Sequence, residues 1–478
     1  MLFNSLQFLV FFSIVSAAHF ALPHRSRWVL LFFASCYFYM VLVPEYILIL
    51  FFLILVDYAA GIFIERTVGA VRRSILIASL VANIGMLGVF KYFNFVDQNL
   101  VLLFNSLGLP YVASNLHIIL PIGLSFHTFQ SMSYTIEVYR GRQKAEYHLG
   151  IYACYVLFYP QMVAGPIERP YNLLRQFREE KSFDYQRVTD GLKLMMWGLF
   201  KKWVIADRLA ILVNLVYGNP AGYAGWPLLL ATYAFAFQIY CDFSGYSDIA
   251  IGAAQVMGFK LMTNFNRPYY AKSIGEFWKR WHISLSTWFR DYLYIPLGGN
   301  RVTRWRWYFN LFFVFLVSGL WHGANWTFVI WGGLHGFYLI SSIWTEKLRE
   351  SIARFVGLTR YPVIRKWLRV FITFHLVLLS WVFFRARSVE EVWFILTHMF
   401  QMPAMPHINL GLHGLDIPVV LTALLMMEGV HLLQRGGSVR QLLAGQPGWV
   451  RWSLYATATL MILLFGEFTS TDFIYFQF

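Results

Sequence analysis

Two histidines stand in a strongly apolar part of the sequence, in the stretch SGLWHGANWTFVIWGGLHG at residues 318–336. His322 and His335 follow the apolar run YFNLFFVFLV, so they are expected at membrane depth. Ionisable side chains within membrane spans are rare, usually face the protein interior, and mark a functional site. Burial keeps an imidazole neutral, and a neutral imidazole can accept a proton from a hydroxyl. We therefore predict His322 as a general base, whereas His335 is interpreted as structural.

The neighbours of His322 suggest how such a site could be built. Gly319 and Gly323 would leave room for a substrate beside the backbone. Asn325 could orient the ring or donate a hydrogen bond to an oxyanion. Trp321 and Trp326 would shape the chamber around it. The alternative interpretation of His322 is a core histidine that donates to a carbonyl.

Residues 260–310 form a basic segment interleaved with aromatic residues, with nine Lys or Arg and two acidic residues. Ser273 followed three residues later by Glu276 is a capping-box pattern. It predicts a helix over about 274–294 with aromatic residues on one face, of the kind that lies at a membrane interface. His282 lies within this predicted helix, next to its aromatic stripe.

The basic segment also predicts the kind of ligand that a site near His282 would take. Cationic and aromatic side chains together suit an anionic, phosphate-bearing ligand with a stacking ring, such as coenzyme A. Lys279, Arg280 and Arg290 are candidates for binding the phosphates. The same charges could instead hold anionic lipid headgroups, and the sequence does not separate these two interpretations.

The composition requires many membrane-spanning elements to position these residues. Of 478 residues, 58% are hydrophobic and 13% are charged, against about 25% charged in soluble proteins. Spans of about 20 apolar residues must be helices. We predict an all-α polytopic membrane protein with about 11 crossings plus re-entrant and interfacial helices. The predicted spans are 2–21 (a retained first helix rather than a cleaved leader), 28–43, 46–64, 74–90, 117–136, 191–216, 228–256, 308–330, 367–384, 415–433 and 453–468.

The net charge of +15 is concentrated in loops between the predicted spans. The loops at 24–27 and 65–73 are basic and are predicted to be cytoplasmic, whereas 93–115 lacks Lys and Arg and is predicted to be outside. A nucleic-acid-binding face is the alternative interpretation of this charge, and it is disfavoured because the charge follows these loops. The three cysteines show no spacing typical of a disulfide framework or a zinc site.

The segment HLGIYACYVLFYPQMVAGPIERP, residues 148–170, breaks the pattern of crossings. It is short, contains Pro160 and Pro166, and has charged loops on both sides. We predict a re-entrant segment that helps to wall an internal chamber. The alternative is an ordinary tilted span.

Two other functional classes fit some of these residues. His322 and His335 are 13 residues apart, a spacing found in membrane cytochromes, but Gly332 and Gly333 are expected to weaken a continuous helix between them. Asp57, Asp242, Asp248 and His322 could form an ion path in a transporter, although no internal repeat supports this. Asp242, Tyr246 and Asp248 are interpreted as structural.

The chain resembles the membrane-bound O-acyltransferase family, in the branch of bacterial alginate O-acetyltransferases. The resemblance rests on WKRWHISLSTWFRDYLYIPLGGN (278–300), the stretch at 318–336, DFSGYSDIAIGAAQVMGFKLMTNFNRPY (242–269), LPIGLSFHTFQSMSYTIEVYRG (120–141), FYPQMVAGPIERP (158–170) and the terminal DFIYFQF (472–478). It implies one domain over 1–478, with a core at about 120–345, peripheral helices at 1–115 and 360–478, and a central funnel or tunnel. The invariant histidine of the family matches His322, and its second histidine matches His282.

The resemblance also implies an activity and its location. An acetyl group would pass from a cytoplasmic thioester, acetyl-CoA, across the bacterial inner membrane. A periplasmic acetyltransferase partner would then relay it to a polysaccharide such as alginate. Acetyl-CoA would be a substrate, and no resident cofactor or metal is implied. His282 would bind the donor or support the oxyanion. The similar D-alanyl branch, which uses an acyl carrier protein, and a scaffold that only holds the partner are the alternatives.

Overall fold

The computed structural model describes residues 1–41, 43–112, 121, 123–162, 165–401, 410–412, 414–434, 439–468 and 473–474. Over these residues the regular structure is helical and contains no strand, as predicted. The chain packs as two compact units, one of residues 1–195 and 249–262 and the other of residues 196–248 and 263–478. Two long helices, α10 (Tyr185–Leu199) and α12 (Trp226–Val256), contribute residues to both units.

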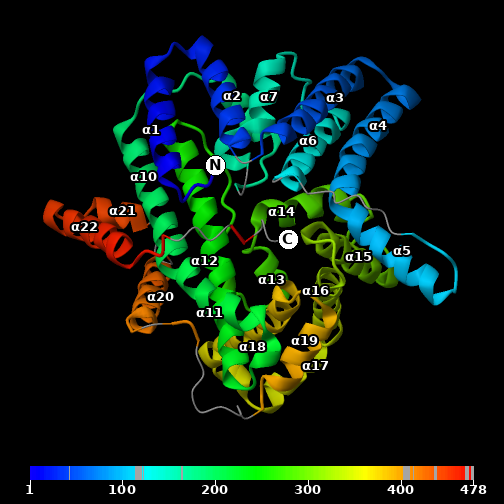
Figure 1. The fold of residues 1–478 in the computed structure, drawn as a ribbon, viewed down its shortest axis with the longest axis vertical. Helices are drawn as coiled ribbons and strands as arrows, with labels where there is room; N and C mark the ends of the chain where they lie inside the picture. The colour runs from blue at the N-terminus through cyan, green and yellow to red at the C-terminus, as the bar shows by residue number, and fades with distance from the viewer. Residues whose placement is uncertain are drawn as a thin grey trace. The chain divides into compact units, whose positions relative to one another are not determined.

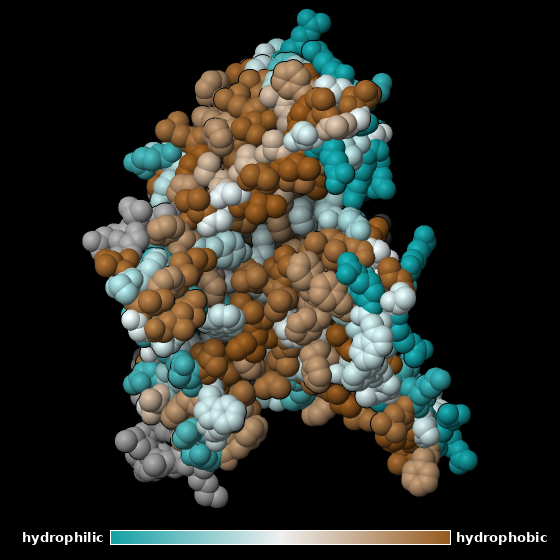
Figure 2. All heavy atoms as spheres, turned by 90° about the vertical axis from the view of Figure 1, so that its right-hand side faces the viewer, coloured by the Kyte–Doolittle hydropathy of each residue, from teal (hydrophilic) through white to brown (hydrophobic). Residues whose placement is uncertain are grey.

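Helices long and apolar enough to cross a membrane occur in both units. Among the described residues there are five: Pro44–Arg66, Gly69–Ser106, Pro362–Arg385, Asp416–Leu433 and Gly448–Phe465. Apolar side chains also cover much of the face drawn in Figure 2. Because such surface is stable against lipid rather than water, the protein is a polytopic membrane protein. The count of about 11 crossings stays a prediction, and residues 117–120 and 122 of one predicted span lie outside the described residues.

The first unit is built from short and medium helices of the N-terminal half (Figure 1). Its helices are α1 (Leu6–Ala21), α2 (His24–Met40), α3 (Ile47–Arg66), α4 (Gly69–Leu87), α5 (Phe93–Ser106), α6 (Leu124–Tyr139), α7 (Leu149–Leu157), α8 (Tyr159–Met162), α9 (Pro170–Arg178) and the first part of α10. A π-helical turn, Gly88–Tyr92, joins α4 to α5. Helices α3, α4 and α6 pack against one another, and α2 packs against α7.

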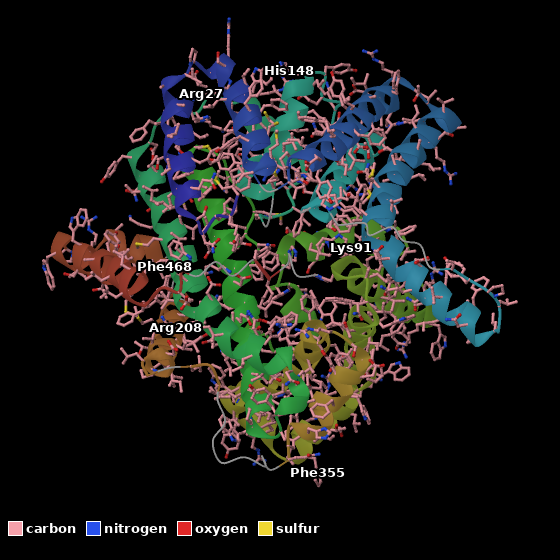
Figure 3. All side chains as sticks on the ribbon, viewed as in Figure 1. Arg27, Lys91, His148, Arg208, Phe355 and Phe468 are labelled. Atoms are coloured by element: carbon pink, nitrogen blue, oxygen red, sulfur yellow. The ribbon has the colours of Figure 1, made fainter. Side chains whose placement is uncertain are left out.

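The segment predicted to be re-entrant contains short helices rather than one crossing. His148 caps the start of α7 (Figure 3), where its ring Nδ1 accepts from the Ile151 backbone N–H at 3.2 Å. At about 1.5 Å per residue, a nine-residue helix such as α7 spans less than half of the membrane core. The tilted-span alternative is therefore disfavoured. Residues 163–164 of this segment lie outside the described part.

The second unit holds both histidines of the predicted site. Its helices are the end of α10, a π-helical turn (Phe200–Ala206), α11 (Asp207–Gly218), most of α12, α13 (Ile274–Trp278), α14 (Ile283–Phe289), α15 (Arg304–His322), α16 (Trp326–Trp344), α17 (Glu346–Phe355), α18 (Pro362–Arg385), α19 (Val389–His398), α20 (Asp416–Leu433), α21 (Val439–Ala444) and α22 (Gly448–Phe465). Arg208, labelled in Figure 3, forms an ion pair with Asp416 and donates to the Phe465 carbonyl at 2.8 Å. These contacts join α11 to the start of α20 and the end of α22.

The predicted span 308–330 is wrong, because it joins the end of one helix to the start of the next. Helix α15 ends at His322, and α16 begins at Trp326 after an extended turn. A β-carbon on Gly323 would lie 2.2 Å from the ring of Phe328, so this glycine makes room for that ring. The two helices pack side by side (Figure 1).

Gly319 and Gly332 make the close contact between α15 and α16. A β-carbon on Gly319 would lie 2.3 Å from the Phe328 carbonyl oxygen and 3.1 Å from the Cα of Gly332. A β-carbon on Gly332 would lie 2.3 Å from the Phe315 carbonyl oxygen. The space at Gly319 and Gly323 is thus filled by the neighbouring helix, and the expectation that it admits substrate is wrong. Small residues allow such close backbone approach between membrane helices.

Substitution of Gly332 by alanine should therefore lower stability. We expect Gly332→Ala to cost about 1–3 kcal/mol, because the backbone on both sides must move. The matched control is Gly85→Ala in α4, where a β-carbon would meet nothing within 4 Å. Thermal unfolding of the purified proteins in detergent measures both, and equal midpoints for Gly332→Ala and the wild type would contradict the packing account.

Candidate active site

His322 is the last residue of α15, and its buried side chain lies among aromatic rings. The ring centroids of Trp321 and Trp331 each lie 4.9 Å from that of the imidazole, and Phe384 lies at 5.4 Å. All three contacts are edge-on. The rings come from α15, α16 and α18, so the packing of three helices holds the imidazole in place.

His282 belongs to the same group of rings. Its centroid lies 6.3 Å from that of Trp321, which also contacts His322. Phe243 of α12 packs edge-on against His282 at 4.6 Å. Two histidines forty positions apart in the sequence thus contact the same indole. The sequence selected both histidines and Trp321, but it did not indicate Phe243, Trp331 or Phe384.

The continuous helix predicted over 274–294 is wrong. Ser273 caps α13 as expected, with its hydroxyl accepting from the Glu276 N–H at 3.1 Å. Helix α13 nevertheless ends at Trp278, and α14 starts only after His282, which has a left-handed φ of 44°. Residues 264–266 cause the break, because Asn266 N–H donates to the Arg280 carbonyl and Ile283 N–H donates to the Asn264 carbonyl, each at 2.9 Å.

Asn325 has a role other than the one predicted. It caps α16, with its Oδ1 accepting from the Thr327 N–H at 3.0 Å and its Nδ2 donating to the Arg387 carbonyl at 2.8 Å. The amide is therefore used to start the helix and to tie it to residue 387. Trp326 is 53% exposed, in contrast to the buried Trp321. Of the predicted wall residues, the structure brings only Trp321 against both histidines.

The three cations predicted to bind phosphates differ in their surroundings. Arg280 donates to Glu276 at 2.7 Å, and Arg290 donates to Asp291 at 2.7 Å. Lys279 is exposed. The two acidic residues of the basic segment thus lie next to two of the three candidates, and the phosphate-binding role of all three stays a proposal.

His335 lies on α16, on a different helix from His322. Trp278 Nε1–H donates to its Nδ1 at 3.3 Å, so its Nε2 carries the proton and donates to the Ser380 hydroxyl at 3.0 Å. These bonds fit the structural interpretation. Helix α16 runs without a break through Gly332 and Gly333. The haem alternative fails for another reason, since the two histidines do not share a helix.

The acidic residues considered for an ion path are bonded within the protein. Lys202 lies 2.8 Å from Asp207 and 2.6 Å from Asp242, and all three are buried. Lys201 pairs with Asp248 at 2.8 Å. In the first unit, Asp57 accepts from the Ser79 hydroxyl at 2.6 Å and from the Asn83 amide at 2.9 Å. Each carboxylate therefore has a local structural partner.

Within the described part of the chain, no group of three or more His, Cys, Asp or Glu side chains is arranged to hold a metal ion. Cys36, Cys154 and Cys241 are buried and unpaired with one another.

Comparison with known proteins gives a consistent result. The profile of the membrane-bound O-acyltransferase family matches residues 73–376, which include every residue of the site except Phe384. The chain is 39% identical over 447 residues to "Probable alginate O-acetylase AlgI" of Pseudomonas aeruginosa, covering 91% of this chain and 82% of that protein.

Relatives with other named substrates also match. The chain is 37% identical to the peptidoglycan O-acetyltransferase of Helicobacter pylori, over 77% of this chain and 72% of that protein. It is 31% identical to the teichoic acid D-alanyltransferase of Streptococcus thermophilus, over 57% of this chain and 70% of that protein.

The buried ion group of Lys202, Asp207 and Asp242 yields a stability prediction. Lys202→Met would remove the buried cation that Asp207 and Asp242 share, and we expect a cost of about 3–5 kcal/mol. The matched control replaces all three residues, as Lys202→Met with Asp207→Asn and Asp242→Asn, and should recover much of that loss. Thermal unfolding in detergent measures both proteins. A single variant as stable as the wild type would refute the pairing.

Proposed function

Because the chain belongs to the membrane-bound O-acyltransferase family and is an acyltransferase, we propose that it transfers an acetyl group from cytoplasmic acetyl-CoA for O-acetylation of an extracytoplasmic polysaccharide such as alginate. The observation that carries the proposal is the grouping of His322 and His282 around Trp321. Both histidines are buried and lie on the two motifs that most resemble the family. Neither residue holds a metal in this account.

In the proposed reaction His322 acts as the general base. Its imidazole accepts the proton of an acceptor hydroxyl, and the hydroxyl oxygen attacks the thioester carbonyl carbon. The tetrahedral intermediate collapses with cleavage of the carbon–sulfur bond, and the proton returns from the imidazolium to the thiolate. The product is an acetyl ester and a free thiol. The aromatic rings around His322 exclude water, which would otherwise compete as the acceptor.

The proposed donor side is the basic segment that contains His282. Lys279, Arg280 and Arg290 are the cations available there for the phosphates of acetyl-CoA, since each lies at least partly exposed. Arg280 and Arg290 would exchange or share their carboxylate partners on binding. Acetyl-CoA acts here as a substrate, and the proposal includes no resident cofactor.

The names of the relatives support transfer to a polysaccharide of the cell surface. A relative that covers 91% of this chain is named for alginate, and one that covers 77% is named for peptidoglycan. We propose the bacterial inner membrane as the location and a periplasmic acetyltransferase as the partner that completes the transfer. D-alanyl transfer from a carrier protein is the second candidate, supported by a match over 57% of the chain.

His322→Ala should abolish acetyl transfer while leaving a folded protein. A positioned general base contributes about 10²–10⁴-fold, so we expect at least a 100-fold lower rate. The assay follows radiolabelled acetyl groups from acetyl-CoA in proteoliposomes that hold the purified protein. His398→Ala is the matched control, because that half-exposed histidine lies on α19, outside the group of rings.

The same assay separates the alternatives. Near-normal turnover by folded His322→Ala protein would refute the base assignment. Transfer from a D-alanyl carrier protein but not from acetyl-CoA would favour the second candidate. Absence of any acyl transfer by the wild type, with retention of a partner protein, would favour a scaffold, whereas an ion flux without acyl transfer would favour a transporter.

A further inference from the structure

Asn264 makes an unusual number of bonds for one buried side chain, and one of them is to His282. The residue lies in the irregular segment before Pro268 and is fully buried. Its Oδ1 lies 3.1 Å from His282 Nδ1, 2.9 Å from the Ser284 hydroxyl and 3.3 Å from the Ser284 backbone nitrogen. Its Nδ2 donates to the Ser247 hydroxyl at 3.2 Å.

These contacts determine which way the amide of Asn264 is turned. The backbone N–H of Ser284 can only donate, so the atom that faces it must be the amide oxygen. The hydroxyl of Ser284 also donates to this oxygen, since that contact is shorter than its 3.4 Å approach to His282 Nδ1. The amide nitrogen is then left for Ser247 on α12.

The orientation of Asn264 determines the tautomer of His282. An amide oxygen has no proton to give, so its contact with His282 is a hydrogen bond only if Nδ1 carries the proton. A neutral imidazole has one N–H, and the lone pair therefore lies on Nε2. Burial lowers the pKa of His282 to about 3, which keeps the ring neutral.

The backbone of the same residue holds the imidazole in position. His282 has the left-handed conformation, with φ 44° and ψ 55°, which is costly for a residue with a side chain. The Asn264 carbonyl accepts the Ile283 N–H at 2.9 Å and stabilises this turn. Asn264 therefore binds the turn through its main chain and the ring through its side chain.

We propose that Asn264 is a positioning residue that holds neutral His282 as the Nδ1–H tautomer and presents Nε2 to the substrates as a hydrogen-bond or proton acceptor. This proposal rests on the proposed function in one respect, namely that His282 contacts the reacting groups. It decides between the two roles considered for His282. A ring without an Nε2–H cannot donate to an oxyanion, so His282 accepts from a substrate hydroxyl or amide instead.

Two substitutions at Asn264 test the proposal in the full-length protein. Asn264→Leu removes the acceptor at similar volume, and we expect kcat to fall by about 10–100-fold with little change in the KM for acetyl-CoA. Asn264→Asp keeps an acceptor at the same place but adds a negative charge, which raises the pKa of His282. A protonated ring cannot accept a hydrogen bond or a proton. As the pH is lowered, the activity of Asn264→Asp should therefore fall at a pH where the wild type is still active.

The other charged groups near this region are the same in all variants. Asp242 and Asp248 on α12 are paired with Lys202 and Lys201. Glu276 is paired with Arg280. A shift of the acid limb that occurs in Asn264→Asp alone therefore reports on the pair of residues 264 and 282.

Asn310→Leu is the control for a purely structural loss. Asn310 is also a fully buried asparagine, and its amide donates to the carbonyls of Leu297 and Gly299 at 3.1 and 3.0 Å. Its removal should lower the thermal stability but leave the kcat of the folded protein and its pH profile unchanged. A wild-type kcat in folded Asn264→Leu, or an unshifted profile in Asn264→Asp, would overturn the proposal.

A spectroscopic measurement keeps the proposal testable without turnover. Histidine ring nitrogens labelled with ¹⁵N, compared with a His282→Gln sample, should show His282 protonated at Nδ1 in the wild type and no longer fixed there in Asn264→Leu. An Nε2–H tautomer in the wild type would refute the inference even if acetyl transfer is confirmed. Wild-type turnover by His282→Ala would instead refute the proposed function and leave the tautomer measurement valid.

Discussion

The close contact between Gly319 and Gly332 is the constraint on which the candidate site depends. It brings the backbones of α15 and α16 together where each helix has no side chain. Trp331, the neighbour of Gly332, is thereby placed edge-on against His322 at the end of α15. A larger residue at either position would separate the helices and remove one wall of the imidazole site. The site is thus held by backbone packing, with aromatic rings filling the remaining space.

The second constraint is the interruption between α13 and α14. In a continuous helix, the helical periodicity would determine the direction of the His282 side chain. Residues 264–266 instead fix a turn there through backbone hydrogen bonds. The turn places His282 between Phe243 and Trp321, which also contacts His322. Two imidazoles from separate motifs therefore share one aromatic neighbour. This arrangement suits chemistry in which an imidazole accepts and returns a proton.

The sequence predicted the class of fold and the two histidines, and the reasons differ. Apolar composition determines a helical membrane protein, and His322 stands out because ionisable residues are rare at membrane depth. His282 stands out instead by its place in a basic segment rich in aromatic residues and by the motif that resembles the family. The errors arose where distant segments decide local structure. The capping pattern at Ser273 predicted the start of α13 correctly, but only the pairing with residues 264–266 ends it. Hydropathy likewise joined α15 to α16, because the turn at Gly323 is apolar enough to resemble a span.

Asn264 and Asn325 show the same limit at the level of single residues. Asn325 attracted a catalytic interpretation because it stands next to His322 in sequence, yet it caps α16. Asn264 stands 18 residues before His282 and gave no local signal, yet it bonds to that ring. A polar residue in an apolar segment indicates that a hydrogen bond exists, but the partner depends on tertiary packing.

The central claim is that His322 and His282 act on one reacting centre. A double-mutant cycle on acetyl transfer in proteoliposomes, with His322→Ala, His282→Ala and both together, tests it most directly. Residues that act as a unit give strongly non-additive losses. We predict that the double variant has the same activity as the less active of the two single variants. The comparison uses transfer rates that exceed the background of protein-free vesicles. Losses that multiply, or a double variant with the wild-type rate, would contradict the account.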